Sequence, residues 1–228
     1  ITESHDPLDL DLTTDFNFLT VGILTAQNPG ADRKNLFYLI KWFVEEFRNN
    51  KEVGLIVKTC QGRDSIIDKV STKKLLSAVL KEINHVGYPK IYFLHGSMDR
   101  KEMSSLYKDP RVKAFVSLTR GEGFGLPHLE SAASGLPVIA TNWSAHKEFL
   151  DLGKWTKINY ELKTIDQTRV DNQIFMSNSR WAEVNEKDFK NKIRNFIKKY
   201  DTAKNDANKL AEKIRENYSW RAVRNRYD

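Results

Sequence analysis

Residues 117–141 constrain the fold of this chain more than any other stretch. They read SLTRGEGFGLPHLESAASGLPVIAT, which predicts the end of a buried strand, a glycine-rich loop, a short helix and a second buried strand. Pro127 suits the first turn of that helix, because the amide hydrogen that it lacks would have no partner there. Gly135 suits a left-handed cap at the end of the helix. The stretch therefore predicts a strand, loop, helix and strand unit of an α/β protein.

The same order of elements recurs before this unit. Short apolar runs predict four buried strands, and residues at helical spacing between them predict the intervening helices; the strands are residues 16–24, 54–59, 91–94 and 112–118. Strands that alternate with helices imply parallel pairing, with helices on both faces of the sheet. We therefore expect an α/β, Rossmann-like, doubly wound parallel sheet that binds its ligands at the carboxyl ends of the strands.

The chain is expected to form one domain. Residues 1–15 are acidic and lack periodicity, which indicates an irregular lead-in, and residues 16–228 carry the predicted domain with its C-terminal helices. Residues 153–180 have no clear period, so we expect an irregular segment with a strand or two. Ser144 is expected to cap a short helix that ends at Leu150. No tract rich in glycine, serine or proline divides the chain.

The formal net charge of +7 is compatible with nucleotide sugars, nucleic acid or the surface of a membrane, and charge alone cannot choose among them. No stretch approaches the roughly 18 apolar residues that span a bilayer, and the N-terminus is charged. We therefore expect a cytoplasmic protein, with peripheral membrane contact as a further expectation. The single Cys60 excludes an internal disulfide and a cysteine zinc site. His128 and His146 lack the spacing of metal ligands.

Two glutamates frame the predicted loop and helix. A helix that begins near Leu126 directs free amide hydrogens and the positive end of its dipole at the loop, which favours phosphate or another anion. Glu130 lies about one turn inside that helix, so its carboxylate can stand beside the anion. Glu122 lies eight residues earlier, in the loop. Carboxylates bind phosphate poorly but accept hydrogen bonds from sugar hydroxyls, so the pattern combines an anion site with sugar acceptors.

The sequence EGFGLPHLE, followed by a small-residue helix and GLPVIAT, closely resembles the Glu-x7-Glu signature of the retaining, family-four glycosyltransferases of GT-B fold. The resemblance covers nearly the whole chain and implies the C-terminal, donor-binding half of a GT-B enzyme. It implies that Glu130 binds the nucleotide ribose and that Glu122 lies against the donor sugar. It also implies that the backbone after Glu122 contacts sugar and diphosphate, namely Gly123, Phe124, Gly125 and Leu126.

The resemblance also places residues from the earlier loops at the donor. Lys34 matches the family lysine that pairs with the donor diphosphate, and its charge opposes the dipole of the predicted helix that follows, which favours a bound anion. The family arginine expected a few residues earlier is replaced by the neighbourhood of Gln27 and Asn28, so either Arg33 completes the phosphate clamp or the clamp differs. Further donor-binding candidates follow the second and third strands: Thr59, His95, Ser97 and Met98.

The implied chemistry is transfer of a sugar from a nucleotide-diphosphate sugar to an acceptor, with retention of configuration and without a metal or other cofactor. The helix end and Lys34 would offset the charge of the leaving diphosphate. Glu122 and Lys34 are therefore the candidate catalytic residues. An acceptor sugar or glycoconjugate is expected to bind through an N-terminal half that these residues do not contain.

Other functions stay open at this point. A noncatalytic module that recognises a nucleotide or sugar for a partner protein would use the same residues. A nucleic-acid-binding domain would depend on the basic C-terminal helices, but no recognised motif supports it and no nucleic acid is expected as partner. A dehydrogenase or a Walker-type nucleotidase is disfavoured, because the first strand is not followed by GxGxxG and the chain contains no GK[ST].

Overall fold

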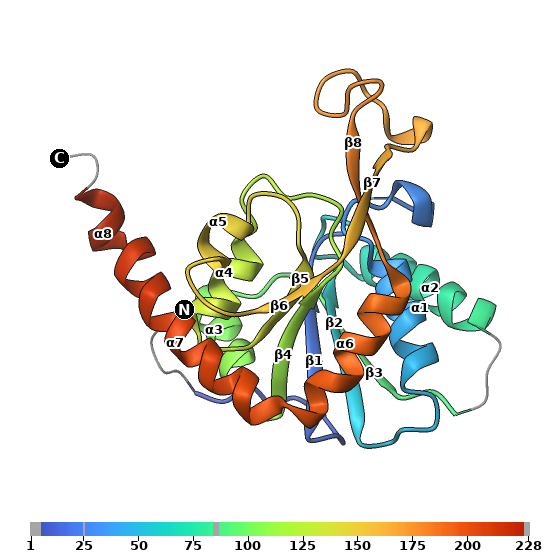
Figure 1. Ribbon diagram of the computed structural model, residues 1–228. Helices are drawn as coiled ribbons and strands as arrows, with labels where there is room; N and C mark the ends of the chain where they lie inside the picture. The colour runs from blue at the N-terminus through green and yellow to red at the C-terminus, as the bar shows by residue number, and fades with distance from the viewer. Residues whose placement is uncertain (1–5, 25, 84–86, 226–228) are drawn as a thin grey trace.

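The computed structural model describes residues 6–24, 26–83 and 87–225. Their main feature is a six-stranded sheet in the order β3-β2-β1-β4-β5-β6, and every neighbouring pair in it is parallel (Figure 1). The strands are β1 (Phe16–Val21), β2 (Val53–Thr59), β3 (Lys90–His95), β4 (Val112–Ser117), β5 (Val138–Thr141) and β6 (Thr156–Ile158). The order reverses between β1 and β4, which is the place where doubly wound sheets bind ligands.

Helices cover both faces of this sheet. One face carries α1 (Leu36–Glu46), α2 (Ile66–Ile83) and α6 (Glu186–Lys198), and the other carries α3 (Arg100–Lys108), α4 (Leu126–Ala133), α5 (Lys147–Leu150) and α7 (Tyr200–Tyr218) (Figure 1). Side chains of a strand alternate between the two cores: Phe18 of β1 packs with the first group and Leu19 with the second. The four inner strands β2, β1, β4 and β5 are mostly buried, as expected for a doubly wound sheet that is covered on both faces.

The predicted strands are confirmed, with shifts of a few residues at their ends. The first strand ends at Val21 and not at Leu24, although Leu24 stays buried and its N–H donates to the Cys60 carbonyl at 2.8 Å. Gly135 adopts the left-handed conformation expected of it, with φ of 74°. The prediction for Ser144 is wrong. α5 begins after His146, and the Ser144 hydroxyl instead bonds to the backbone of Glu122.

The expectation of an irregular segment with a strand or two in residues 153–180 is confirmed by β6 and β7 (Tyr160–Thr164), but the antiparallel hairpin that β7 forms was not predicted. Its strands are β7 and β8 (Arg180–Val184), and a 3-10 turn, η2 (Gln167–Arg169), lies in the connection. The hairpin stands out beyond the edge of the sheet, on the side of η1 (Pro29–Ala31) (Figure 1). It therefore rises above the carboxyl ends of the parallel strands.

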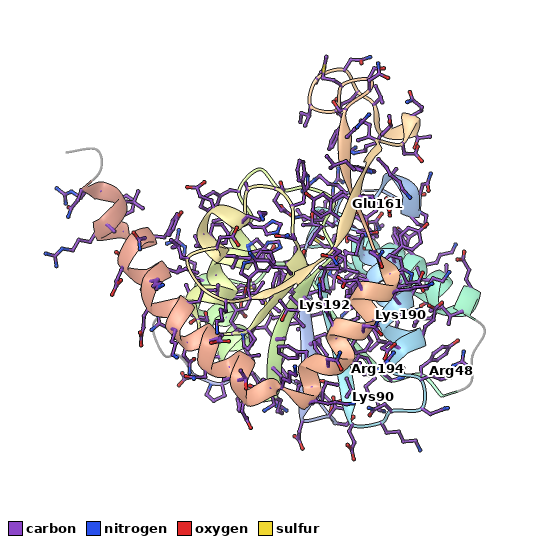
Figure 2. The ribbon with its side chains drawn as sticks, in the orientation of Figure 1. Arg48, Lys90, Glu161, Lys190, Lys192 and Arg194 are labelled. Carbon is purple, nitrogen blue, oxygen red and sulfur yellow. The ribbon has the colours of Figure 1, made fainter. Side chains whose placement is uncertain are left out.

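Ion pairs hold α6 against α1. Figure 2 shows three basic side chains along α6. Lys190 Nζ lies 2.5 Å from Glu45 Oε2, and Arg194 pairs with Glu46, so two of these charges meet carboxylates of α1. Lys192 Nζ lies 2.8 Å from Asp188 Oδ2 within α6 itself. Part of the basic charge of the C-terminal region is therefore matched by acidic partners. The last helix of the described residues is α8 (Trp220–Arg224), and the Ser219 hydroxyl caps it by accepting a hydrogen bond from the Ala222 N–H.

Residues 6–15 precede β1 and contain no helix or strand, but they are packed against the domain. Leu8, Leu10 and Leu12 contact the core that α3 and α4 share, and the Asp6 carbonyl accepts a hydrogen bond of 2.7 Å from Ser105. The first five residues of the predicted lead-in lie outside the described residues. No helix in the described part of the chain is both long and apolar enough to cross a bilayer.

Candidate functional site

The loops that follow β1 and β4 meet at the point where the strand order reverses. The Arg120 N–H donates to the Arg33 carbonyl at 2.9 Å, and the Thr119 hydroxyl donates to the same oxygen at 3.3 Å. The Arg33 guanidinium in turn donates to the Gly121 carbonyl. The glycine-rich loop is therefore fixed to the start of α1 by bonds in both directions.

Glu122 and Lys34, the two candidate catalytic residues, are in direct contact. Lys34 Nζ lies 2.7 Å from Glu122 Oε1 and 2.9 Å from Oε2, and Arg33 Nη1 lies 3.3 Å from Oε2. Burial opposes ionisation of Glu122, but Lys34, and after it Arg33, outweigh burial and hold the pKa of this carboxyl below its ordinary value. Glu122 is therefore an anion at neutral pH, although its side chain is only 6% exposed.

Ser144 fixes the backbone of Glu122 from the other side. Its Oγ accepts a hydrogen bond of 2.8 Å from the Glu122 N–H and donates one of 2.7 Å to the Glu122 carbonyl. Ser144 has a positive φ of 84°, an unusual conformation for a residue that is not glycine. This role of Ser144 was not evident from the sequence, since a serine before a short helix is typical of a cap and nothing local indicates a contact 22 positions away.

The start of α4 lies open beside this cluster. Its N-cap is Gly125, which has φ of 91°, whereas Gly121 and Gly123 do not need the left-handed region. A Cβ on Gly125 would lie 3.0 Å from the His146 Cβ, so glycine is required there for space as well as for conformation. No described side chain caps α4. Pro127 has no amide hydrogen, and the His128 and Leu129 N–H groups donate to the Gly125 carbonyl at 3.0 and 3.1 Å, so Leu126 is the residue of the first turn that keeps its amide hydrogen for solvent or a ligand. Phe124 and Leu126 flank this end and are 42% and 58% exposed.

Two histidines support the loop from below. The rings of His128 and His146 stack with their centroids 4.4 Å apart, and both side chains are buried. Burial lowers the pKa of both, so they are neutral imidazoles at physiological pH. His146 Nε2 lies 2.8 Å from the Thr141 carbonyl. These residues pack under Gly125 and act as part of the core.

Glu130 is half-buried on α4. Its Oε2 accepts a hydrogen bond of 3.3 Å from the Tyr107 hydroxyl. Burial raises the pKa of the Glu130 carboxyl, and the bond from Tyr107 offsets this only in part. Burial, together with Glu130, raises the pKa of Tyr107, which therefore stays protonated and available as a donor. The two signature glutamates thus differ: Glu122 is held ionised by cations, and Glu130 is a desolvated acceptor.

This difference gives a pH prediction for Glu130. The pKa of Glu130 in the folded protein lies above its ordinary value of 4.5. The protonated carboxyl therefore adds to the free energy of unfolding below about pH 4.5, and this contribution is lost as the pH rises through the raised pKa. Glu130→Gln keeps an acceptor for Tyr107 and has no charge. We therefore expect its melting temperature to exceed that of the wild type at about pH 8 by more than at about pH 4. Thermal unfolding followed by circular dichroism checks this, and an equal difference at both pH values would contradict it.

The remaining predicted residues lie at the ends of β2 and β3. His95 Nε2 lies 2.7 Å from Asp68 Oδ1, and its side chain is 5% exposed, so this ring is engaged by a carboxylate. Thr59 is buried, and Met98 packs against the core. The Ser97 N–H donates to Asp64 Oδ2 at 3.2 Å. A role for these four residues in holding a nucleotide base stays a prediction.

A cavity of about 560 Å³ opens beside Glu122. The loop residues 121–123 and the pair Trp143 and Ser144 line one side, and residues of the β7–β8 hairpin line the other. Another cavity, of about 580 Å³, lies between α6, α7 and the segment before β6, and none of the predicted donor-binding residues lines it. The chemistry of its walls therefore makes the cavity at Glu122 the candidate site.

Arg120 forms part of the wall of this cavity, and its role was not evident from the sequence. Its guanidinium is 2% exposed and pairs with Glu183 of β8 at 3.0 and 3.1 Å. Its Nη1 also donates to the carbonyls of Pro29 and Asp32 at 2.8 and 2.7 Å. The Arg120 Cζ lies 5.0 Å from the centroid of the Trp181 ring. This residue therefore attaches the hairpin to the β1–α1 loop and to the signature loop.

Comparisons with known proteins agree with this architecture. Residues 76–226 match the sequence model of the family described as Family 4 Glycosyltransferase in conflict systems. A probable sucrose-phosphate synthase of Oryza sativa subsp. japonica is 33% identical over 131 residues, which cover 52% of this chain and 11% of that protein. The chain thus spans a small part of this curated relative.

Solved structures share the fold of nearly the whole chain. A sucrose-phosphate synthase from Thermosynechococcus elongatus matches with a TM-score of 0.62 and 15% identity, covering 93% of this chain and 43% of that one. The C-terminal domain of a glycosyl transferase group 1 family protein from Francisella tularensis matches with a TM-score of 0.61 and 17% identity, covering 94% and 95%. The predicted Rossmann-like fold of a GT-B C-terminal half is confirmed.

Proposed function

Because the chain belongs to the family-four glycosyltransferases of conflict systems, we propose that it is the donor-binding half of an enzyme that transfers a sugar from a nucleotide-diphosphate sugar. The observation that carries this proposal is the contact between Lys34 and Glu122 beside the uncapped start of α4. A cationic group, a buried carboxylate and free amide hydrogens there suit a ligand that joins a sugar to a diphosphate.

Each group has a distinct part in the proposed chemistry. The amide hydrogens from Gly123 to Leu126 and the dipole of α4 bind the diphosphate. Lys34 extends one ammonium between Glu122 and the phosphate, and Arg33 adds a second positive charge, so both offset the charge on the leaving diphosphate. Glu130 accepts from the ribose hydroxyls. No step in this scheme needs a metal.

The anionic state of Glu122 supports its place against the sugar. Positive charge develops on the sugar ring when the bond to the diphosphate breaks, and a nearby carboxylate stabilises that charge. Ser144 and Lys34 hold Glu122 from two sides, so the carboxylate keeps its position during the reaction. Retention of configuration is the outcome that we propose for the transfer.

The acceptor is proposed to bind between this domain and a second lobe. This is supported by the match to 95% of the length of a solved C-terminal domain, against 43% of a sucrose-phosphate synthase. The domain alone should therefore bind donor and transfer little. The identity of the acceptor, a cytoplasmic location and peripheral membrane contact stay predictions.

Calorimetric titration tests the proposed function. We expect the chain to bind the uridine, guanosine or adenosine diphosphate form of a sugar with a dissociation constant below about 1 mM. Glu130→Ala should weaken that binding about tenfold, since a charged acceptor for two hydroxyls is lost. Glu212→Ala, at an exposed position of α7, is the matched control and should bind as the wild type does.

Two results would remove the proposal: no binding of any of the three nucleotide sugars, or an unchanged affinity in Glu130→Ala. The alternative of a noncatalytic recognition module uses the same pocket, so binding alone does not separate it from an enzyme. Transfer of the sugar on addition of an acceptor-binding lobe would exclude that alternative.

A further inference from the structure

The β7–β8 hairpin forms the wall of the cavity that faces Glu122. Its contribution comes from the connection between the strands and from the start of β8: Ile165, Arg169, Ile174, Phe175, Ser179, Arg180 and Trp181. The hairpin stands above the carboxyl edge of the sheet, where the signature loop also lies (Figure 1). A group that binds against Glu122 and Gly123 in this cavity therefore meets the hairpin on its other side.

Four arginines line the cavity, and two of them have partners within the protein. The Arg120 guanidinium forms an ion pair with Glu183 and donates hydrogen bonds to two backbone carbonyls. Arg33 pairs with Glu122 and the Gly121 carbonyl. The negative charge of Glu122 is further matched by Lys34. The single carboxylate in the cavity wall is thus already compensated.

The other two arginines belong to the hairpin and have no such compensation. Neither Arg169 nor Arg180 forms an ion pair with a carboxylate of the described residues. Arg169 lies with its Cζ 4.2 Å from the centroid of the Phe175 ring, and its Nε is buried without a hydrogen-bond partner in the described part of the chain. Asp171 interacts with Arg169 electrostatically, but its Oδ1 accepts three backbone N–H groups at 2.9 Å.

Arg169 and Arg180 therefore give this wall positive charge that no carboxylate of the described residues pairs with, and this favours an anion. A buried donor without a partner is costly, and a guanidinium binds a carboxylate through two parallel hydrogen bonds. The diphosphate of the proposed donor is accounted for by the start of α4 and Lys34, so it does not fill this wall. Trp143 also lines the cavity, and the face of an aromatic ring suits the apolar face of a sugar ring.

We propose that the hairpin selects the donor sugar and that Arg169 and Arg180 bind a carboxylate carried by that sugar. The preferred donor is then a nucleotide-linked hexuronate, and the corresponding neutral hexose binds less well. This inference rests on the proposed function, because it assumes that the sugar lies against Glu122. The cavity volume of about 560 Å³ lies within the usual range of small-ligand sites, about 300–1,000 Å³.

Paired titrations test the inference. The chain is titrated with UDP, UDP-glucose and UDP-glucuronate, with GDP, GDP-mannose and GDP-mannuronate, and with ADP, ADP-glucose and ADP-glucuronate. For the base that binds, we expect the uronate to bind at least about tenfold more tightly than the neutral sugar. In Arg169→Met with Arg180→Gln this preference should disappear, while the affinity for the nucleoside diphosphate stays unchanged. Methionine keeps an apolar contact with Phe175, which preserves the packing of the hairpin.

Controls separate the inference from general charge attraction and from loss of fold. Arg221→Gln, on the exposed surface of α8, removes one positive charge elsewhere and should keep the uronate preference. Arg180→Lys keeps the charge but loses the paired hydrogen bonds, and should reduce the preference in part. A circular dichroism melt of each variant verifies that the domain is folded.

The outcomes are distinct. Equal binding of uronate and neutral sugar, or a preference that survives in the double variant, would overturn the inference and leave the proposed function in place. Failure of every nucleotide and nucleotide sugar to bind would instead remove the proposed function, and the inference with it. Binding of free glucuronate only in the presence of UDP-glucose, and only with both arginines intact, would place the carboxylate on the acceptor and overturn the assignment to the donor.

Discussion

Lys34→Met is expected to weaken binding of the nucleoside diphosphate by about 10- to 100-fold, the loss that one or two charge-assisted hydrogen bonds produce. Lys34 Nζ already lies within 3 Å of both Glu122 oxygens, so its position is fixed before the ligand arrives. Removing it takes away the proposed phosphate ligand and also leaves Arg33 as the cation that pairs with Glu122. Calorimetric titration with the nucleoside diphosphate measures the effect.

The control is Lys69→Met, at an exposed position of α2, which removes the same charge away from the site and should bind normally. An unchanged affinity in Lys34→Met would contradict the role of Lys34. The variant should also alter the response to acid. The pKa of Glu122 is lowered mainly by Lys34, so wild-type stability includes a contribution that is present above the ordinary pKa of 4.5 and is lost as pH falls through the lowered value. That contribution should shrink in Lys34→Met.

Arg120→Met is expected to produce the largest loss of stability, about 3 kcal/mol, because it leaves Glu183 and two carbonyls without their buried donor. We take the lower end of the usual range since Glu183 is 25% exposed and regains some solvation. For a chain of 228 residues this corresponds to a fall in melting temperature of about 6–12 °C. Thermal unfolding followed by circular dichroism measures it.

A second variant identifies the mechanism. Arg120→Met with Glu183→Gln removes the unpaired carboxylate and should recover part of the lost stability, which a double-mutant cycle expresses as a coupling between the two residues. Arg221→Met serves as the control and should melt with the wild type, because this side chain is exposed on α8. A loss in Arg120→Met that matches the control would show that the ion pair does not stabilise the domain.

Local pattern was sufficient to predict the parallel sheet and its helices. Each of the first five strands is a short apolar run, and buried parallel strands need no alternation, so residues such as those of β2 are recognisable without their neighbours. The hairpin was not predictable in this way. β7 is exposed along most of its length, and β8 pairs with it across a connection of irregular sequence, so neither has a clear apolar period.

The residues of the candidate site were likewise predictable only where a local sequence pattern marks them. The resemblance to a known signature located Glu122, Glu130 and Lys34, and the structure brings Glu122 and Lys34 into contact. Contacts between distant segments stayed hidden, because no local pattern encodes them. Ser144 meets Glu122 from the loop after β5, and Arg120 meets Glu183 from β8. Both depend on how the sheet places its loops.

The hairpin pairs Thr164 with Arg180, so the chain enters and leaves its outer part at one place. Below that place Arg120 and Glu183 anchor the stem to the sheet. Residues 165–179 can consequently be shortened, lengthened or replaced without changing the order of the strands in the sheet. If the hairpin selects the sugar as proposed, a change confined to these residues would alter the donor sugar and leave the proposed diphosphate site unchanged.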